Sequence, residues 1–309
     1  MIASLLRIDN WWMITMCFLV ALPCALLGAF LILRRMSLVG DAISHSALPG
    51  IVVAFAFVGD LSSPWLLVGA AIAGVLVTFL IEQIHRHTRI KQDAAIGIAF
   101  TSLFALGLVL IRVLLGDKVH LHQDSVLEGN VSHVAYAATV NVFGFDVPDS
   151  IIPAAIVAVV TLVLIMIFYR VLTLSSFDSG LAASFGYKPA MVHYTLMAVI
   201  SVVVVSAFEA VGAILVIALL ILPGATAYLC THRLKLMLVL SVVHALSSSI
   251  LGVYLSVLFN GKESAGVVVA GTILFIIAWM FGPADGVIIK AIQRRNNTLE
   301  ESNSKLLKH

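Results

Sequence analysis

The sequence predicts an all-α membrane protein, a polytopic transmembrane bundle of about eight to nine spans. Of its 309 residues, 61% are hydrophobic and 11% are charged, whereas soluble domains average about 45–50% and about 25%. The mean hydropathy is +1.11. Apolar runs of about 20 residues, the length that crosses a bilayer, recur along the chain. These observations exclude a soluble globular domain.

Nine apolar runs are candidates for these spans. They are Trp11–Leu33, Leu38–Val58, Pro64–Ile84, Ala94–Leu115, Ile151–Val171, Met191–Phe208, Val211–Leu229, Leu236–Phe259 and Ala265–Ile289. The count is eight or nine because two runs share the stretch Met191–Leu229. Its polar joint, Phe208-Glu209-Ala210, predicts either a tight hairpin or an interrupted helix pair that does not cross fully, and it makes Glu209 a candidate functional residue.

Basic residues divide the connectors into two sets. Most of the lysines and arginines between runs lie in Arg34–Arg35, His85–Gln92, Ser175–Pro189, Thr231–Lys235 and the tail from Lys290. The positive-inside rule places these in the cytoplasm, which puts the N-terminus outside and the C-terminus inside. We therefore expect a transmembrane domain over residues 1–292 and a polar, disordered cytoplasmic tail over 293–309.

Asp41 and His45 lie one helical turn apart in an apolar segment that follows two arginines. Residues at i and i+4 share one helix face. Ionisable groups in hydrocarbon are costly, so such positions are functional candidates. The alternative is that Asp41 sits near the headgroups and His45 hydrogen-bonds a neighbouring helix. Of the ten histidines, only His45 and His244 lie clearly inside predicted spans. Carboxylate and imidazole suit borderline divalent metals.

Two stretches outside the spans carry further candidates. The outer connector 116–150 holds His120, His122, Asp124, Glu128 and His133, which could bind a cation weakly or form a solvated loop. Leu174–Pro189 is too polar to cross and is patterned like a short helix on the membrane surface. That helix would either contact a peripheral partner or serve only as an interfacial anchor.

Four motifs taken together resemble the permease subunits of bacterial ABC importers for manganese, zinc and iron. They are RRMSLVGDAISHSALPGI (34–51), IKQDAAIGIAFTSLFALGLVL (90–110), SSFDSGLAASFG (175–186) and AFEAVGAILVIALLILPGATAYL (207–229) followed by HRLKLML. The forms FEAVGAIL and DSVLEGNV are more similar to the manganese and iron branch than to the zinc branch.

The resemblance implies a multi-pass permease of the bacterial plasma (inner) membrane. It implies a homodimer, or a heterodimer with a paralogous permease, bound to two cytoplasmic ATP-binding cassette subunits and supplied by an extracytoplasmic metal-binding protein. The family's GD-x-x-SH pattern places metal passage on Asp41 and His45, to which His244 and Glu209 are added from their depth and chemistry. The short cytoplasmic coupling helix would involve Phe177, Asp178, Ala182 and Gly186.

No intrinsic cofactor, nucleic-acid partner or enzymatic activity is expected of this chain. It has no G-x-x-x-x-G-K-[ST] loop, so ATP would be hydrolysed by another subunit. The alternatives are an ion-coupled secondary metal transporter, which also uses broken helices and buried carboxylates, and an intramembrane metalloenzyme. H-E-x-x-H and G-x-S-x-G are both absent from the sequence, which disfavours the enzyme. A purely structural membrane subunit would leave Asp41, His45, His244 and Glu209 unexplained.

Overall fold

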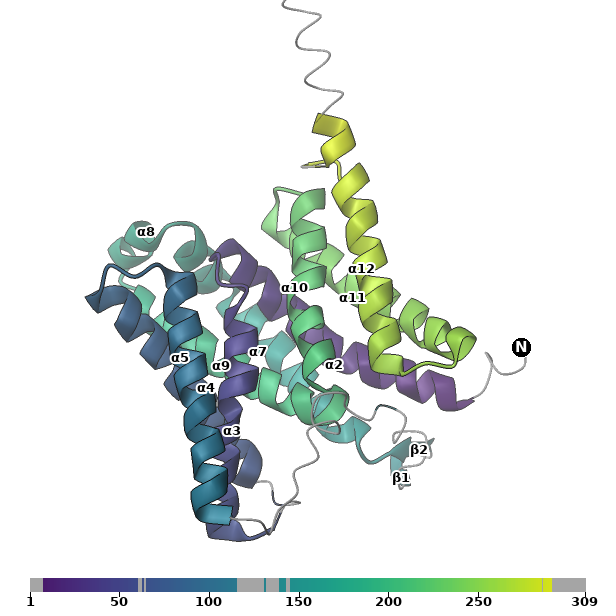
Figure 1. Ribbon diagram of the computed structural model, residues 1–309. Helices are drawn as coiled ribbons and strands as arrows, with labels where there is room; N and C mark the ends of the chain where they lie inside the picture. The colour runs from purple at the N-terminus through teal and green to yellow at the C-terminus, as the bar shows by residue number, and fades with distance from the viewer. Residues whose placement is uncertain are drawn as a thin grey trace, which may run out of the picture.

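The predicted fold class is confirmed by the computed structural model, an all-α transmembrane bundle (Figure 1). The structure describes residues 8–60, 63, 65–115, 131, 139–142, 145–284 and 286–290. Its helices are α2 (Ile8–Leu33), α3 (Val39–Val58), α4 (Trp65–His87), α5 (Gln92–Leu110) with the π-helical turn η1 (Ile111–Leu115), α7 (Ile151–Phe177), α8 (Ser179–Ser184), α9 (Pro189–Val211), α10 (Ala213–Cys230), α11 (Leu234–Phe259) and α12 (Glu263–Phe281).

Within the described ranges, eight helices are long and apolar enough to cross a membrane, and Ile214–Cys230 is a shorter apolar helix. That ninth helix corresponds to α10. Its 18 residues reach about 27 Å at 1.5 Å per residue, slightly less than the ~30 Å hydrocarbon core. The structure thus agrees with the predicted range of eight to nine spans.

Helix α2 forms much of the core, and it packs against α7, α9, α10 and α11. Its apolar window is 72% buried, whereas that of α7 is 22% buried. The largest buried side chains of α2 are Phe30, Leu27 and Leu31. Both helices are similarly apolar, and lipid and protein interiors are almost equally apolar, so packing rather than composition places α2 innermost and α7 outward.

Small residues let neighbouring helices approach closely. A methyl group at Gly50 of α3 would collide with the Gly69 carbonyl oxygen of α4. A methyl group at Gly266 of α12 would likewise collide with the Gly252 carbonyl oxygen of α11. These two helix pairs therefore depend on glycine at their contacts.

The helix pair at Met191–Leu229 breaks at Gly212, and not at the predicted joint Phe208-Glu209-Ala210. Helix α9 continues to Val211, and Gly212 joins it to α10 with φ 84° and ψ 161°. Glycine adopts this backbone conformation readily because it has no Cβ, whereas glutamate fits within a helix. α9 and α10 are thus two separate helices that meet at one residue.

The cytoplasmic ends of α7 and α12 also differ from the prediction. Helix α7 continues beyond Val171 to Phe177, which shortens the predicted surface helix to the six residues of α8. Helix α12 ends at Phe281 rather than at Ile289, since Gly282-Pro283 interrupts it. The outer connector contributes a β-hairpin, β1 (Thr139–Val142) with antiparallel β2 (Phe145–Pro148), which we did not predict. The tail 293–309 lies outside the described residues and stays a prediction.

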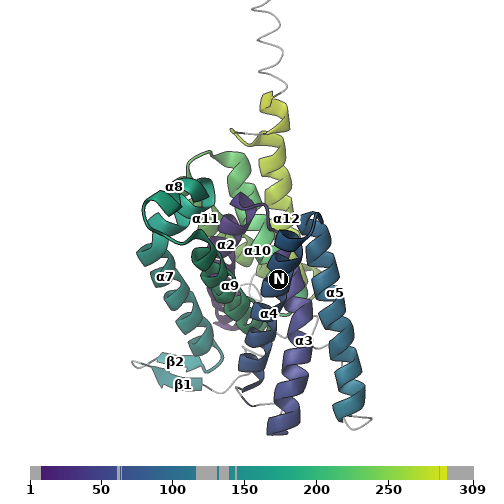
Figure 2. The same cartoon turned by 90° about the vertical axis from the view of Figure 1, so that its left-hand side faces the viewer.

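The two ends of the bundle have different connectors. In Figures 1 and 2, α8 and the turn from α4 to α5 lie near the top, and the hairpin β1–β2 lies near the bottom. The turn from α10 to α11 and the end of α12 also lie towards the top (Figure 1). The connectors that we assign to the cytoplasm therefore share one end of the molecule.

Candidate functional site

The sequence-predicted pair Asp41 and His45 forms a direct contact on α3. Asp41 lies in the first turn of the helix, where the helix dipole favours a carboxylate. His45 lies one turn later, and its Nε2 is 3.3 Å from Asp41 Oδ1. The i, i+4 spacing thus produces the expected shared face, with an imidazole and a carboxylate side by side.

The Asp41–His45 pair is partly exposed on one side of the isolated chain. The His45 side chain is 37% exposed and that of Asp41 is 35% exposed. The rings of Phe100 and Phe104 on α5 lie against His45, each with its centroid 5.9 Å from the imidazole centroid. The aromatic rings hold the imidazole on the α5 side, while the remaining exposed surface can accept an ion or a group from another subunit.

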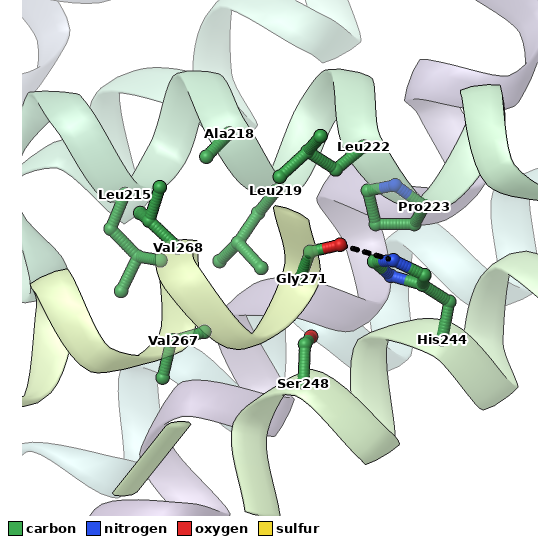
Figure 3. Close-up of a pocket in the computed structure, with 10 residues that line it drawn as sticks. All are labelled: Leu215, Ala218, Leu219, Leu222, Pro223, His244, Ser248, Val267, Val268 and Gly271. Atoms are coloured by element: carbon green, nitrogen blue, oxygen red, sulfur yellow. Dashed lines mark hydrogen bonds between the residues drawn. The ribbon is translucent and has the colours of Figure 1, made fainter. Parts of the chain in front are cut away.

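His244 lies in a different setting, in an apolar crevice between α10, α11 and α12 (Figure 3). The side chain is only 5% exposed. Figure 3 shows its ring beside Pro223 and Gly271, with Nε2 3.2 Å from the Gly271 carbonyl oxygen. The crevice has no room for a water molecule. The remaining lining residues are Leu215, Ala218, Leu219, Leu222, Ser248, Val267 and Val268.

The hydrogen bond to Gly271 determines which nitrogen of His244 carries the proton. A carbonyl oxygen only accepts, so Nε2–H must donate, which leaves the Nδ1 lone pair free. Nδ1 is buried and has no hydrogen-bond partner. Metal-binding histidines commonly donate their other N–H to a backbone carbonyl in this way. His244 therefore has the chemistry of a ligand, but its crevice is closed.

Among the predicted metal-site residues whose side chains the structure describes, Asp41 and His45 come together, whereas His244 lies in another part of the bundle. Helix α3 packs mainly on α4 and α5, whereas α11 packs mainly on α12, α2 and α10. Among the described residues there is no group of three or more histidine, cysteine, aspartate or glutamate side chains that could hold a metal. The Glu209 side chain lies outside the described part, as do the acidic and histidine residues of 116–130 and His133.

The predicted coupling residues surround α8. Asp178 is its N-cap, and its Oδ1 accepts a hydrogen bond of 2.9 Å from the Leu181 backbone N–H. Ala182, within α8, is fully buried on the side of the helix that faces the bundle. Gly186 ends the segment with φ 84°. Phe177 is 62% exposed. The segment is thus fixed to the bundle by its small and capping residues and presents an aromatic side chain outward.

Sequence reasoning missed a second polar group near α8. Arg34 was assigned only to a basic connector, and Glu82 and His193 lie at the ends of predicted spans. Arg34 Nη1 lies 3.4 Å from His193 Nδ1, and His193 Nε2 lies 3.5 Å from Glu82 Oε2. The available signal was that all three titratable residues were predicted at the same membrane face.

Comparisons with known proteins identify relatives over nearly the whole chain. The ABC 3 transport family matches residues 10–282. The manganese transport system membrane protein MntD of Bacillus subtilis is 38% identical over 292 residues, which cover 94% of this chain and 98% of MntD. The zinc transport system membrane protein TroD of Treponema pallidum is 38% identical over 276 residues, covering 89% of this chain and 75% of TroD.

A solved structure has the same fold. PsaBC from Streptococcus pneumoniae, determined in complex with Fab, superposes with a TM-score of 0.74 at 33% sequence identity. The match covers 92% of this chain and 97% of that chain. The similarity thus extends through most of the bundle.

Proposed function

Because the chain belongs to the ABC 3 transport family, we propose that it is the permease through which an ATP-driven importer moves divalent transition-metal ions into the cytoplasm. Manganese or iron is favoured over zinc. The proposal is carried by one observation, the Asp41–His45 contact inside a membrane-spanning helix. Relatives named for manganese and for zinc transport support the ion class.

The chemistry of the pair suits transient binding of such an ion. A carboxylate oxygen and an imidazole nitrogen are ligands for manganese, iron and zinc. Two ligands from one chain hold an ion weakly, since structural metal sites have about four. An ion that binds weakly can also leave, as passage requires.

The exposed side of the pair supports a dimer, with a second copy or a paralogous permease. Asp41 and His45 are each about one-third exposed in the isolated chain. A partner subunit facing them would supply further ligands and exclude lipid from the ion. His244 and Glu209 stay proposed pathway residues, and His244 contributes only if α10, α11 and α12 separate, because its crevice is closed.

The second part of the proposal concerns the cytoplasmic ATPase. Phe177 and Phe185 flank α8 and are 62% and 66% exposed. They lie at the end of the bundle that the basic connectors assign to the cytoplasm. Exposed aromatic side chains are typical anchors for a protein partner. α8 is therefore the proposed coupling helix, with Asp178, Ala182 and Gly186 keeping it in place. An extracytoplasmic metal-binding protein would deliver the ion at the opposite end.

Metal uptake with and without the ATPase tests this function. Cells lacking the chain receive it back, with the ATPase gene present or deleted, and accumulation of ⁵⁴Mn²⁺, ⁵⁵Fe²⁺ and ⁶⁵Zn²⁺ is measured. We expect uptake of manganese or iron that requires both the chain and the ATPase. Uptake that survives loss of the ATPase would identify a secondary transporter instead. Metal-dependent hydrolysis of a peptide or lipid by the purified chain would identify a metalloenzyme.

A further inference from the structure

A group of polar side chains, the Arg34 cluster, joins four separate parts of the chain beside α8. It consists of Arg34, Glu82, Ser175, Ser176 and His193. Arg34 Nε donates to Ser176 Oγ at 3.1 Å, and Arg34 Nη2 donates to Ser175 Oγ at 3.2 Å. The cluster thus connects the turn before α3 with α4, the end of α7 and the start of α9.

Hydrogen bonding in the Arg34 cluster runs in one direction. The guanidinium group only donates, so Nδ1 of His193 must accept from Arg34. The proton of His193 is then on Nε2, which faces Glu82. The other oxygen of Glu82 pairs with Arg86 Nε. His193 and Glu82 are only 15% and 12% exposed, so these contacts are largely shielded from water.

Arg34 contacts the chain on both sides of α8. Ser175 and Ser176 lie in the last turn of α7, two to three residues before Asp178, the N-cap of α8. His193 lies at the start of α9, directly after the α8 segment. A movement of α8 that displaces the end of α7 or the start of α9 must therefore either carry Arg34 with it or break these contacts.

Arg34 is also closely connected to the helix that carries the metal pair. The Met36 N–H donates to the Leu31 carbonyl at 2.9 Å, and the Arg35 N–H donates to the Ile32 carbonyl at 2.9 Å. With Arg35 at φ 58°, these bonds form a Schellman-type helix end. Helix α3 begins three residues after Met36, and Asp41 lies in its first turn. The turn is short and hydrogen-bonded, so it has little slack.

We propose that Arg34 is a positioning residue that transmits movement of α8 to the Asp41–His45 pair. The proposal rests on the proposed role of α8 as the contact of the ATPase. Burial lowers the pKa of the Arg34 guanidinium, but arginine stays charged in proteins. Its planar fork bonds both serines while it also contacts His193, a geometry that a lysine ammonium does not reproduce.

Reconstitution of the complete importer tests this role. The permease and its ATPase are placed in proteoliposomes and supplied with the extracytoplasmic metal-binding protein, and accumulated ⁵⁴Mn²⁺ and released phosphate are measured in the same vesicles. In the Arg34→Gln variant we expect ATP hydrolysis to continue while the amount of Mn²⁺ moved per ATP falls about tenfold, a typical coupling effect. Arg34→Lys should recover only part of the ratio. A merely structural role would lower both rates together and leave the ratio unchanged.

Two further variants serve as control and safeguard. Arg35→Gln removes the same charge one residue later, from an exposed side chain, and should leave the ratio at its wild-type value. A double variant, Ser175→Ala with Ser176→Ala, removes the two acceptors and keeps Arg34. The double variant should also lower the amount of Mn²⁺ moved per ATP. Combined with Arg34→Gln, it should lower this ratio little further, because the three residues act together.

The outcomes separate this proposal from the proposed function. A wild-type complex that moves Mn²⁺ with ATP, together with unchanged ratios in Arg34→Gln and in the serine double variant, overturns the role of Arg34 alone. If Arg34→Gln does not fold, the serine double variant decides. A wild-type complex that hydrolyses ATP but moves no Mn²⁺, Fe²⁺ or Zn²⁺ overturns the proposed function and the Arg34 proposal with it.

Discussion

His45 and His244 are both histidines in spanning helices, but their surroundings are opposite. His45 is 37% exposed and contacts Asp41. His244 is 5% exposed, and its only side-chain hydrogen bond in the described part of the chain goes to the Gly271 backbone. The first has a carboxylate partner and access from outside the chain. The second has a free lone pair in a closed apolar crevice.

This difference separates ligand chemistry from access, both of which the proposed metal passage requires. The Asp41–His45 pair meets both in the structure as it stands. His244 meets the first, and access to it requires the helices around the crevice to move apart. The two regions should therefore respond differently to substitution.

The largest loss of metal uptake is expected from substitutions in the Asp41–His45 pair. Asp41→Ala and His45→Ala should each reduce ⁵⁴Mn²⁺ uptake to the background level, because one remaining ligand cannot compensate an ion for lost water. The amount of protein in the membrane, measured by immunoblot, should not change. Asp149→Ala removes an exposed carboxylate at the outer end and should leave uptake intact. Normal uptake in both pair variants would contradict the assignment.

A smaller effect is expected at His244. His244→Leu keeps most of the side-chain volume but removes the lone pair, and it should lower uptake about tenfold, as loss of an auxiliary ligand interaction does. It also removes the bond to Gly271, worth about 1 kcal/mol of stability. Ser248→Ala is the matched control, since Ser248 lines the same crevice and bonds only its own helix, at Ala245. Full uptake in His244→Leu would show that His244 only packs α11 against α12.

The smallest effect is expected at Gly271. A methyl group there would lie 3.4 Å from His244 Cε1 and 3.3 Å from Leu222 Cδ1, so both must shift slightly. Alanine is also favoured over glycine in a helix by about 1 kcal/mol, which offsets the crowding. Gly97→Ala meets nothing within 4 Å and should raise the thermal denaturation temperature in detergent. Gly271→Ala should raise it less, and an equal rise would show that the crevice is loosely packed.

Features that depend on neighbouring residues in the chain could be predicted from the sequence. The spans follow from apolar runs, because backbone groups in a bilayer must be satisfied within each helix. The contact between Asp41 and His45 follows from helix geometry alone. One such prediction was wrong in its position. The break between α9 and α10 lies at Gly212, because glycine tolerates φ 84°, whereas the prediction placed it at the polar joint Phe208-Glu209-Ala210.

Features that join distant segments were decided by the tertiary structure. The crevice of His244 combines residues from α10, α11 and α12, and the Arg34 cluster combines residues up to 159 positions apart. Apolar runs of similar composition do not specify which helices become neighbours, because lipid and protein interiors are almost equally apolar. The sequence by itself determined that this chain spans the membrane and pairs an acid with an imidazole on α3. The packing of α10, α11 and α12 decided that His244 is enclosed, and the packing of α7 and α9 beside the turn before α3 decided that Arg34 meets Ser175, Ser176 and His193.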